Sequence, residues 1–156
     1  MSGAGPAVAA GPVVAAGTGR WAWARVDLGG MSEPAALVRP LALEEVFTRQ
    51  ERMRSAARST LASWGGRLAA KHAVTTALGY DTPPAPLTGV EVLPSVPRGC
   101  PRGHACPHGH PPEVTLGADY AELAAGAGVR RIQVSVSHTA RVAVAVALVT
   151  WTTDGG

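Results

Sequence analysis

The chain has 156 residues, which is enough for one domain with a hydrophobic core and too few for two ordinary domains. Hydrophobic residues make up 46% of the sequence but aromatic residues only 4%, so the core must consist mainly of small side chains packed closely together. The net charge is +3, and the arginines are spread along the chain with no run of about five or six like charges. This argues against nucleic acid as a partner and leaves an acidic protein or a phosphate.

The N-terminal nineteen residues are rich in Ala, Gly, Pro and Val and carry no charged side chain. We expect residues 1–19 to form a disordered leader, because the segment lacks the basic start of a secretory signal and its glycines and prolines break any helix. The longest apolar run elsewhere, residues 142–149, is too short for a membrane helix of about twenty residues. Two cysteines in one loop are too few for a disulfide scaffold, so we expect a soluble, cytoplasmic protein.

The first regular elements are a strand and two helices. Between residues 21 and 28, large or charged side chains alternate with small or aliphatic ones, which predicts a half-buried strand. The strand ends at a glycine pair, so Asp27 lies at the strand end. Helical spacing predicts one helix over residues 41–58 and a second over residues 59–78. Gly79 supplies a C-cap for the second helix.

The second half of the chain predicts two hairpins and a short helix. A Pro- and Gly-rich region contains one strand at residues 89–93, whose partner is expected at 113–116. An Ala-rich helix over 117–128 follows, and alternating strands over 132–137 and 142–148 form the last hairpin. This order predicts an α+β domain with an antiparallel sheet over residues 20–151, followed by a flexible tail at 152–156.

One short segment stands out within the second helix. The run Gly66–Ala73 contains Lys71, the only lysine of the chain, followed directly by His72, whereas the other thirteen basic residues are all arginine. A lysine in a composition that otherwise avoids it suggests that an ammonium group is required at this position.

Together with three other features, this segment resembles the holo-acyl-carrier-protein synthase group of 4′-phosphopantetheinyl transferases. The other features are Asp27 at the end of the first strand, Gly109 and Pro111 after the first hairpin, and residues 136–139 in the last hairpin. The resemblance covers about residues 20–151 and implies a compact α+β protomer, with an antiparallel sheet packed on a long helix, that trimerises. It further implies that coenzyme A lies in a cleft between neighbours and that phosphopantetheine is moved onto a carrier-protein serine.

The resemblance also implies a set of functional residues, which this sequence keeps only in part. The family holds Mg²⁺ on the aspartate at Asp27 and on a glutamate directly after the motif lysine, but that second position is His72 here. A further family lysine, credited with proton transfer, falls on Thr76. The expected contacts for the cofactor are Lys71, Arg67, His138 and Thr139.

The histidine leads to our main hypothesis. Imidazole is a poor ligand for Mg²⁺ but suits proton transfer, especially beside a carboxylate that orients it and raises its pKa. We therefore hypothesise an acid–base enzyme without a cofactor, with His72 as base and Asp27 as its partner. Its reaction would be dehydration of a 3-hydroxyacyl group on an acyl carrier protein, during polyketide or fatty acyl chain building.

Two alternatives remain open. The first is a working 4′-phosphopantetheinyl transferase that uses coenzyme A and Mg²⁺, with Asp27 as a metal ligand and Glu44, Glu45 or water completing the site. The second is a non-catalytic partner that only binds a carrier protein. In each case we expect an acyl carrier protein as partner, in a homo-oligomer, most simply a trimer, or a hetero-oligomer.

Each candidate residue also has a structural explanation. Asp27 can accept turn N–H groups before Gly29, and Arg67 can pair with Glu51 or another acid instead of a phosphate. Lys71 can be a solvated helix residue, and His72 an ordinary helix histidine. His138 can be held by backbone bonds in a hairpin turn.

A cluster of metal-binding residue types lies between the two middle strands. It comprises Cys100, His104, Cys106, His108 and His110. Thiolate and imidazole groups bind zinc, but the spacing lacks the paired C-x₂-C of familiar structural sites. The sequence leaves metal binding here undecided.

Overall fold

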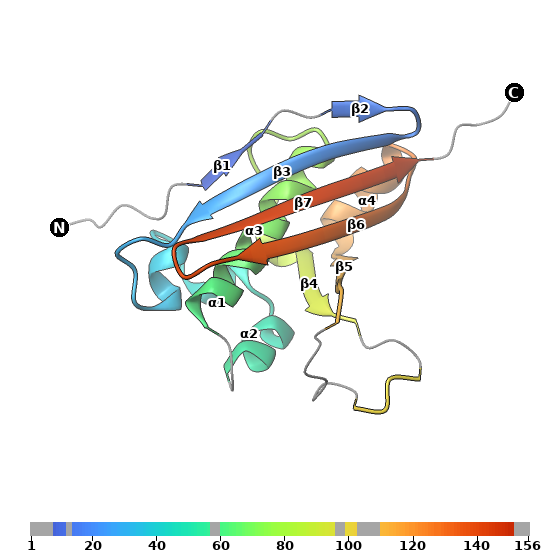
Figure 1. Ribbon diagram of the computed structural model, residues 1–156. Coiled ribbons are helices and arrows are strands. Elements are labelled where there is room, and N and C mark those ends of the chain that lie inside the picture. Colours follow the sequence, from blue (N-terminus) through green and yellow to red (C-terminus); the bar gives the residue numbers. More distant parts are fainter. Residues whose placement is uncertain (1–7, 12–13, 57–59, 96–98, 103–109, 152–156) are drawn as a thin grey trace, which may run out of the picture.

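The computed structural model describes residues 8–11, 14–56, 60–95, 99–102 and 110–151. Its main feature is an antiparallel sheet in the order β1-β3-β7-β6, with β2 pairing to the same edge of β3 as β1. The long helix α3 packs across one face of this sheet (Figure 1). The elements are β1 (Val8–Ala10), β2 (Val14–Ala16), β3 (Gly19–Asp27), β6 (Val129–His138), β7 (Val142–Trp151) and α3 (Leu61–Ala77).

Small side chains bring α3 close to the sheet. On the inner face, Ala22 and Ala24 of β3 lie opposite Ala147 and Ala145 of β7, and all four are buried. A side chain at Gly65 of α3 would meet Leu28 at 2.6 Å, which is closer than real contacts allow. The expected close packing of small residues therefore extends to the helix itself.

The region between β3 and α3 contains two short helices instead of the single helix predicted over residues 41–58. They are α1 (Leu43–Val46) and α2 (Arg49–Ala56), preceded by the 3₁₀ turn η1 (Pro34–Leu37). The backbone of Phe47 is extended, and Thr48 caps α2 by accepting the N–H of Glu51 at 3.2 Å. The prediction of one helix was wrong because the Thr48-x-x-Glu51 capping box starts a new helix inside the apolar pattern.

The two middle strands and the short helix after them lie where the sequence predicted them, and a 3₁₀ turn that was not predicted precedes them. The 3₁₀ turn η2 (Leu87–Gly89) leads into a two-stranded sheet of β4 (Val90–Pro94) and β5 (Pro112–Leu116), and the helix α4 (Ala118–Gly126) follows. The buried Tyr120 of α4 donates a hydrogen bond to the carbonyl of Ala85 at 2.7 Å, which ties α4 to the segment before η2. The predicted α+β class with an antiparallel sheet on a long helix is confirmed.

The described part of residues 1–19 forms two short strands instead of the disordered leader that the sequence predicted. Val8 pairs with Val26 and Val14 with Trp21, so β1 and β2 extend the sheet along β3. Main-chain hydrogen bonds to a strand edge need no particular side chain, which is why an Ala-, Gly- and Val-rich segment can form them. The predicted tail at 152–156 lies outside the described residues. Among those that are described, no helix combines the length and the apolar character that crossing a membrane requires.

Candidate functional site

Helix α3 carries the motif residues and presents them in three directions. Thr60 caps the helix by accepting the N–H of Ser63 at 3.2 Å, and Gly79 ends it with a φ of 101° that favours glycine. Gly65 and Gly66 face the sheet, Lys71 points toward α2 and β4, and His72 lines a cavity on a third side. The predicted site residues are therefore divided among three surroundings.

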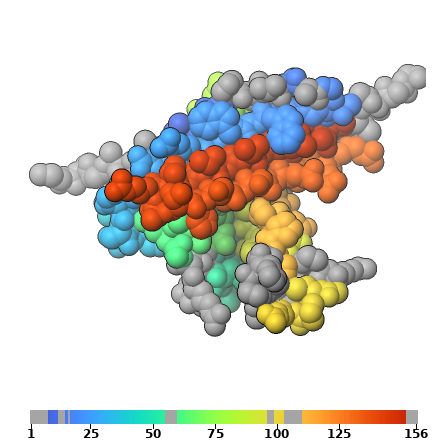
Figure 2. Space-filling model, in the orientation of Figure 1, coloured from blue at the N-terminus to red at the C-terminus, as the bar shows by residue number. Residues whose placement is uncertain are grey.

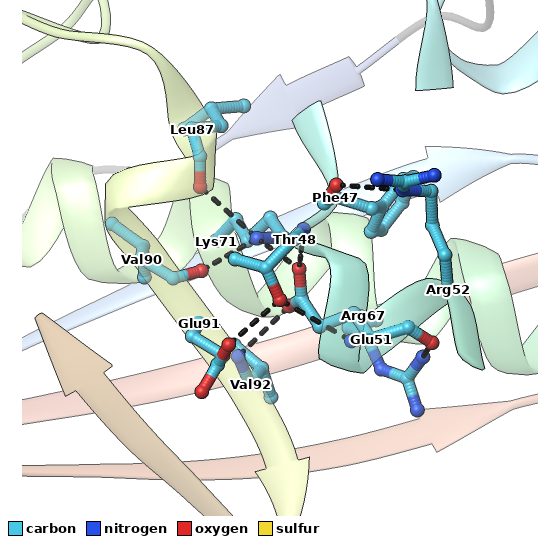
Figure 3. A network of polar contacts seen from close by, with 10 residues as sticks. All are labelled: Phe47, Thr48, Glu51, Arg52, Arg67, Lys71, Leu87, Val90, Glu91 and Val92. Carbon is cyan, nitrogen blue, oxygen red and sulfur yellow. Dashed lines mark hydrogen bonds and ion pairs between the residues drawn. The ribbon is translucent and has the colours of Figure 1, made fainter. Parts of the chain in front are cut away.

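Lys71 lies inside the protein and is completely buried. Its ammonium group forms an ion pair with Glu51 at 2.9 Å and donates hydrogen bonds to the carbonyls of Leu87 at 3.0 Å and Val90 at 2.6 Å (Figure 3). Burial lowers the pKa of Lys71, while the charge of Glu51 opposes that shift. With three partners around it, this ammonium group has no donor left for the phosphate that the sequence suggested as its ligand.

Glu51 is the centre of the same network and is also completely buried. Its carboxylate accepts the backbone N–H groups of Thr48 at 2.7 Å and Val92 at 2.9 Å (Figure 3). Arg67 donates to the backbone carbonyl of Glu51 at 3.1 Å, and burial lowers the pKa of Arg67 while Glu51 raises it. Arg67 and Lys71 thus both lie in the network that joins α3 to α2 and β4.

His72 has a different environment. It is half-buried and lines a cavity of about 510 Å³. Within the described part of the chain, the imidazole of His72 makes no hydrogen bond. No buried side-chain N or O atom there lacks a partner, so the ring nitrogens of His72 reach accessible space. Burial, and then the charge of Lys71, lower the pKa of His72. The ring is therefore neutral near pH 7 and able to accept a proton.

The cavity beside His72 is mainly apolar. Its walls come from η1 and the following residues, from α1, from α3, and from the segment that leads into η2, with Val8 of β1 at one side. The apolar part of the lining consists chiefly of Leu37, Val38, Val46, Leu68, Pro83 and Leu87. Besides His72, the polar residues on its wall are Arg39, Glu45 and Thr88. A cavity of this size and character can hold a small organic group.

Asp27 does not lie with His72. The side chains of Val26 and Leu28 point into the core toward α3, so the alternation of the strand directs Asp27 to the opposite, exposed face of the sheet. One carboxylate oxygen accepts the N–H of Gly29 at 2.9 Å, as the structural explanation for this residue predicted. Among the residues that the structure describes, no hydrogen bond or ion pair joins Asp27 to His72, so the geometry does not supply the His–Asp pair that dehydration requires.

The residues present do not fit a Mg²⁺ ion. The ion prefers oxygen ligands in an octahedron, and His72 replaces the second carboxylate that the family resemblance implies. Glu44 is exposed, and the carboxylate of Glu45 already accepts the N–H of Ala42 at 2.7 Å. No group of three potential metal ligands occurs within the described ranges.

Three of the predicted residues share one end of the sheet. Asp27 pairs with Val142, and the end of β6 and the turn before Val142 carry His138 and Thr139, both exposed. The hydroxyl of Thr139 accepts the N–H of Val142 at 3.2 Å, and the ring of His138 lies beside Gly66 of α3. These residues are close to the N-terminal half of α3 but do not line the cavity.

The Cys and His cluster is described only at its two ends. The sulfur of Cys100 lies 3.3 Å from Nε2 of His110, in the loop between β4 and β5. His104, Cys106 and His108 lie outside the described residues.

Sequence reasoning missed the acidic half of the buried network. Glu51 was considered only as a possible partner of Arg67, and Thr48 and Glu91 were not considered at all. A signal was present, because the Thr48-x-x-Glu51 spacing is that of a capping box and the single lysine of the chain needs a counter-charge if it is buried. Thr48 continues the network by donating to Glu91 at 2.7 Å.

Comparison with known proteins gives likeness in structure alone, since no family model and no curated protein sequence matches the chain. The structure described as a Chronobacterium ammoniagenes ACPS–CoA complex is 26% identical, with a TM-score of 0.62, and the match covers 94% of this chain and 99% of that one. Helicobacter pylori holo-[acyl-carrier-protein] synthase in complex with coenzyme A is 22% identical, with a TM-score of 0.53, over 69% of this chain and 80% of that one. The holo-ACP synthase of Plasmodium yoelii is 18% identical, with a TM-score of 0.54, over 71% and 78%.

Proposed function

Because the chain has the fold of holo-acyl-carrier-protein synthases in the 4′-phosphopantetheinyl transferase superfamily, we propose that it transfers 4′-phosphopantetheine from coenzyme A to a serine of an acyl carrier protein. The observation that carries this proposal is the likeness, over nearly the whole chain, to a structure described as an ACPS–CoA complex. It favours the transferase over the dehydratase, which the sequence placed first and which depended on contact between His72 and Asp27.

The reaction needs a base at the attacking hydroxyl. The serine oxygen forms a new bond to the phosphorus next to pantetheine, and the phosphorus–oxygen bond to the adenosine 3′,5′-bisphosphate leaving group breaks. The serine proton must be taken up as this happens. We propose that the imidazole of His72 accepts the serine proton. Its ring nitrogens are accessible, and its lowered pKa keeps the ring in the neutral form near pH 7.

The other predicted residues take supporting roles in this proposal. His138 and Thr139 are exposed beside the N-terminal half of α3, and we propose that they contact the nucleotide end of coenzyme A. The apolar wall around His72 would exclude water from the proton transfer. No step is assigned to Lys71 or Arg67 at the substrate, because both are engaged in the buried network.

A transfer assay with paired histidine variants tests this proposal. Release of adenosine 3′,5′-bisphosphate is measured with coenzyme A, Mg²⁺ and apo carrier protein. We expect release by the wild-type protein, a loss of at least about a hundredfold in His72→Gln because general-base catalysis contributes about that much or more, and no change in His110→Gln. Equal rates in the two variants would remove His72 from the reaction. No release by the wild type while carrier protein still binds would favour the non-catalytic partner instead.

A further inference from the structure

Lys71 links the helix that carries His72 to the wall of the cavity on which His72 lies. It directly precedes His72 in α3, and its ammonium group donates to the carbonyls of Leu87, the first residue of η2, and Val90, the first residue of β4 (Figure 3). The side chains of Leu87 and Thr88 in η2 line the same cavity as His72. A displacement of Lys71 would therefore change the position of α3 and the shape of the cavity together.

We propose that Lys71 is the positioning residue for His72, holding the helix that carries the imidazole against the η2 wall of the cavity from inside the protein. The catalytic meaning of this assignment rests on the proposed transferase function. The assignment itself rests on the three contacts of the ammonium group, which leave it no free donor for a phosphate. It also gives a reason for the single lysine of the chain, since a compact ammonium group satisfies two carbonyls and a carboxylate where a planar guanidinium group would not fit as well.

The charge of Lys71 acts on the same imidazole. The other charged residues on the cavity wall are Arg39, which is 49% exposed and 3.7 Å from Glu33, and Glu45, whose carboxylate caps α1. The wall formed by residues 83–88 contributes no charged group. Burial is the main reason why the pKa of His72 is lowered, and the cation at Lys71 adds to it. The same residue therefore fixes the base and favours its proton-accepting form.

The test requires a double substitution, because Lys71 is the counter-ion of the buried Glu51. Lys71→Met alone would leave Glu51 as a buried charge without its counter-ion and is expected to impair folding. The variant Lys71→Met/Glu51→Gln removes both charges and keeps side chains of similar length, and the amide oxygen introduced at position 51 can still accept the N–H of Val92. Its fold is checked by the amide NMR spectrum before any titration.

The measurement is the pH titration of the His72 ring by NMR, which requires no activity. We expect the pKa of His72 to rise toward its ordinary value of about 6.5 in the double variant, because the neighbouring cation is gone. The matched control is Arg39→Gln, which removes an exposed cation from the cavity wall and is expected to leave the pKa of His72 where it is. An unchanged or lower pKa in a folded double variant would overturn the proposal.

Transfer activity gives an independent second readout. In the double variant we expect the acidic limb of the pH–rate profile to move to higher pH, and kcat to fall by more than KM rises. A fall in rate with an unmoved profile would mean that Lys71 only stabilises the fold. If the wild-type protein shows no transfer at all, the proposed function fails, and the NMR titration still decides whether Lys71 acts on His72.

Discussion

Lys71 and His72 are neighbours in the sequence but lie in opposite surroundings. The ammonium group is sealed among three partners, whereas the imidazole reaches a cavity and makes no hydrogen bond within the described chain. Successive residues of a helix point about 100° apart, so adjacent positions readily serve a structural and a functional role. At the scale of the residue, α3 thus places Lys71 in a structural contact inside the protein and leaves the imidazole of His72 accessible for chemistry.

The histidine predicts a specific dependence of stability on pH. The pKa of His72 is lowered on folding, so the unfolded chain binds its proton at a higher pH than the folded one. The contribution of His72 to stability is therefore complete above about pH 6.5 and is lost as the pH falls through the folded value. We expect the free energy of unfolding, measured in urea, to fall less over this range in His72→Phe than in the wild type. Equal slopes would contradict the lowered pKa.

The ion pair predicts a large effect of a single substitution on stability. Lys71→Met leaves the carboxylate of Glu51 buried without its cation, and we expect the free energy of unfolding to fall by about 3–5 kcal/mol. The double variant Lys71→Met/Glu51→Gln is expected to recover part of this loss, because it buries no uncompensated charge. A cost below about 1 kcal/mol for Lys71→Met would show that the pair is exposed to water in solution, since exposed pairs contribute that little.

At the scale of the element, two helix caps of the same residue type can be compared. Thr60 caps α3 with an exposed hydroxyl, whereas Thr48 caps α2 and also donates to Glu91 at 2.7 Å in a partly buried position. Loss of a cap costs about 1 kcal/mol, so we expect about that for Thr60→Ala and a larger loss for Thr48→Ala, which also removes the donor to Glu91. Urea unfolding of both variants provides the comparison, and a larger effect at Thr60 would contradict the network.

The regular elements could be predicted from the sequence because their periods are local properties. Alternation located β3 and the last hairpin, the short runs within the Pro- and Gly-rich region located β4 and β5, and helical spacing with Gly79 located α3. The break between α1 and α2 was missed because apolar spacing continues through it. The pairing of β1 and β2 could not be predicted because edge strands are held by main-chain bonds that leave little trace in composition.

The candidate site was less predictable, because it depends on which face each residue occupies. Asp27 has the same parity in β3 as Trp21 and Trp23, which are exposed, and that alternation already indicated that it points away from the helix. Burial of Lys71 could not be read from the motif, since its partner Glu51 lies twenty positions earlier. A sequence motif fixes the spacing of residues along one helix or strand, whereas the walls of the cavity come from several elements that are far apart in the sequence.

At the scale of the whole molecule, the outer face of the sheet predicts assembly. Trp21 and Trp23 are 44% and 38% exposed, and they lie opposite Leu148 and Val146 of β7. Figure 2 shows atoms of β3, β7 and β6 uncovered on this side. Exposed aromatic and aliphatic side chains gathered on one face typically mark a contact between proteins.

The resemblance to holo-acyl-carrier-protein synthases implies a trimer, and we expect the protein to trimerise in solution through this face. Light scattering with size-exclusion chromatography is predicted to give three times the mass of the chain for the wild type and a smaller mass for Trp21→Glu. The control is Met53→Glu, which changes a side chain that is 60% exposed on α2, away from the sheet, and is expected to leave the mass unchanged. A monomeric wild-type protein would contradict the trimer.

The proposed transfer is tested most directly by the intact mass of an acyl carrier protein after incubation with this protein, coenzyme A and Mg²⁺. The account predicts that the apo carrier gains the mass of one phosphopantetheine group on its serine. An unchanged apo carrier, together with loss of one water from a carrier that bears a 3-hydroxyacyl group, would contradict it.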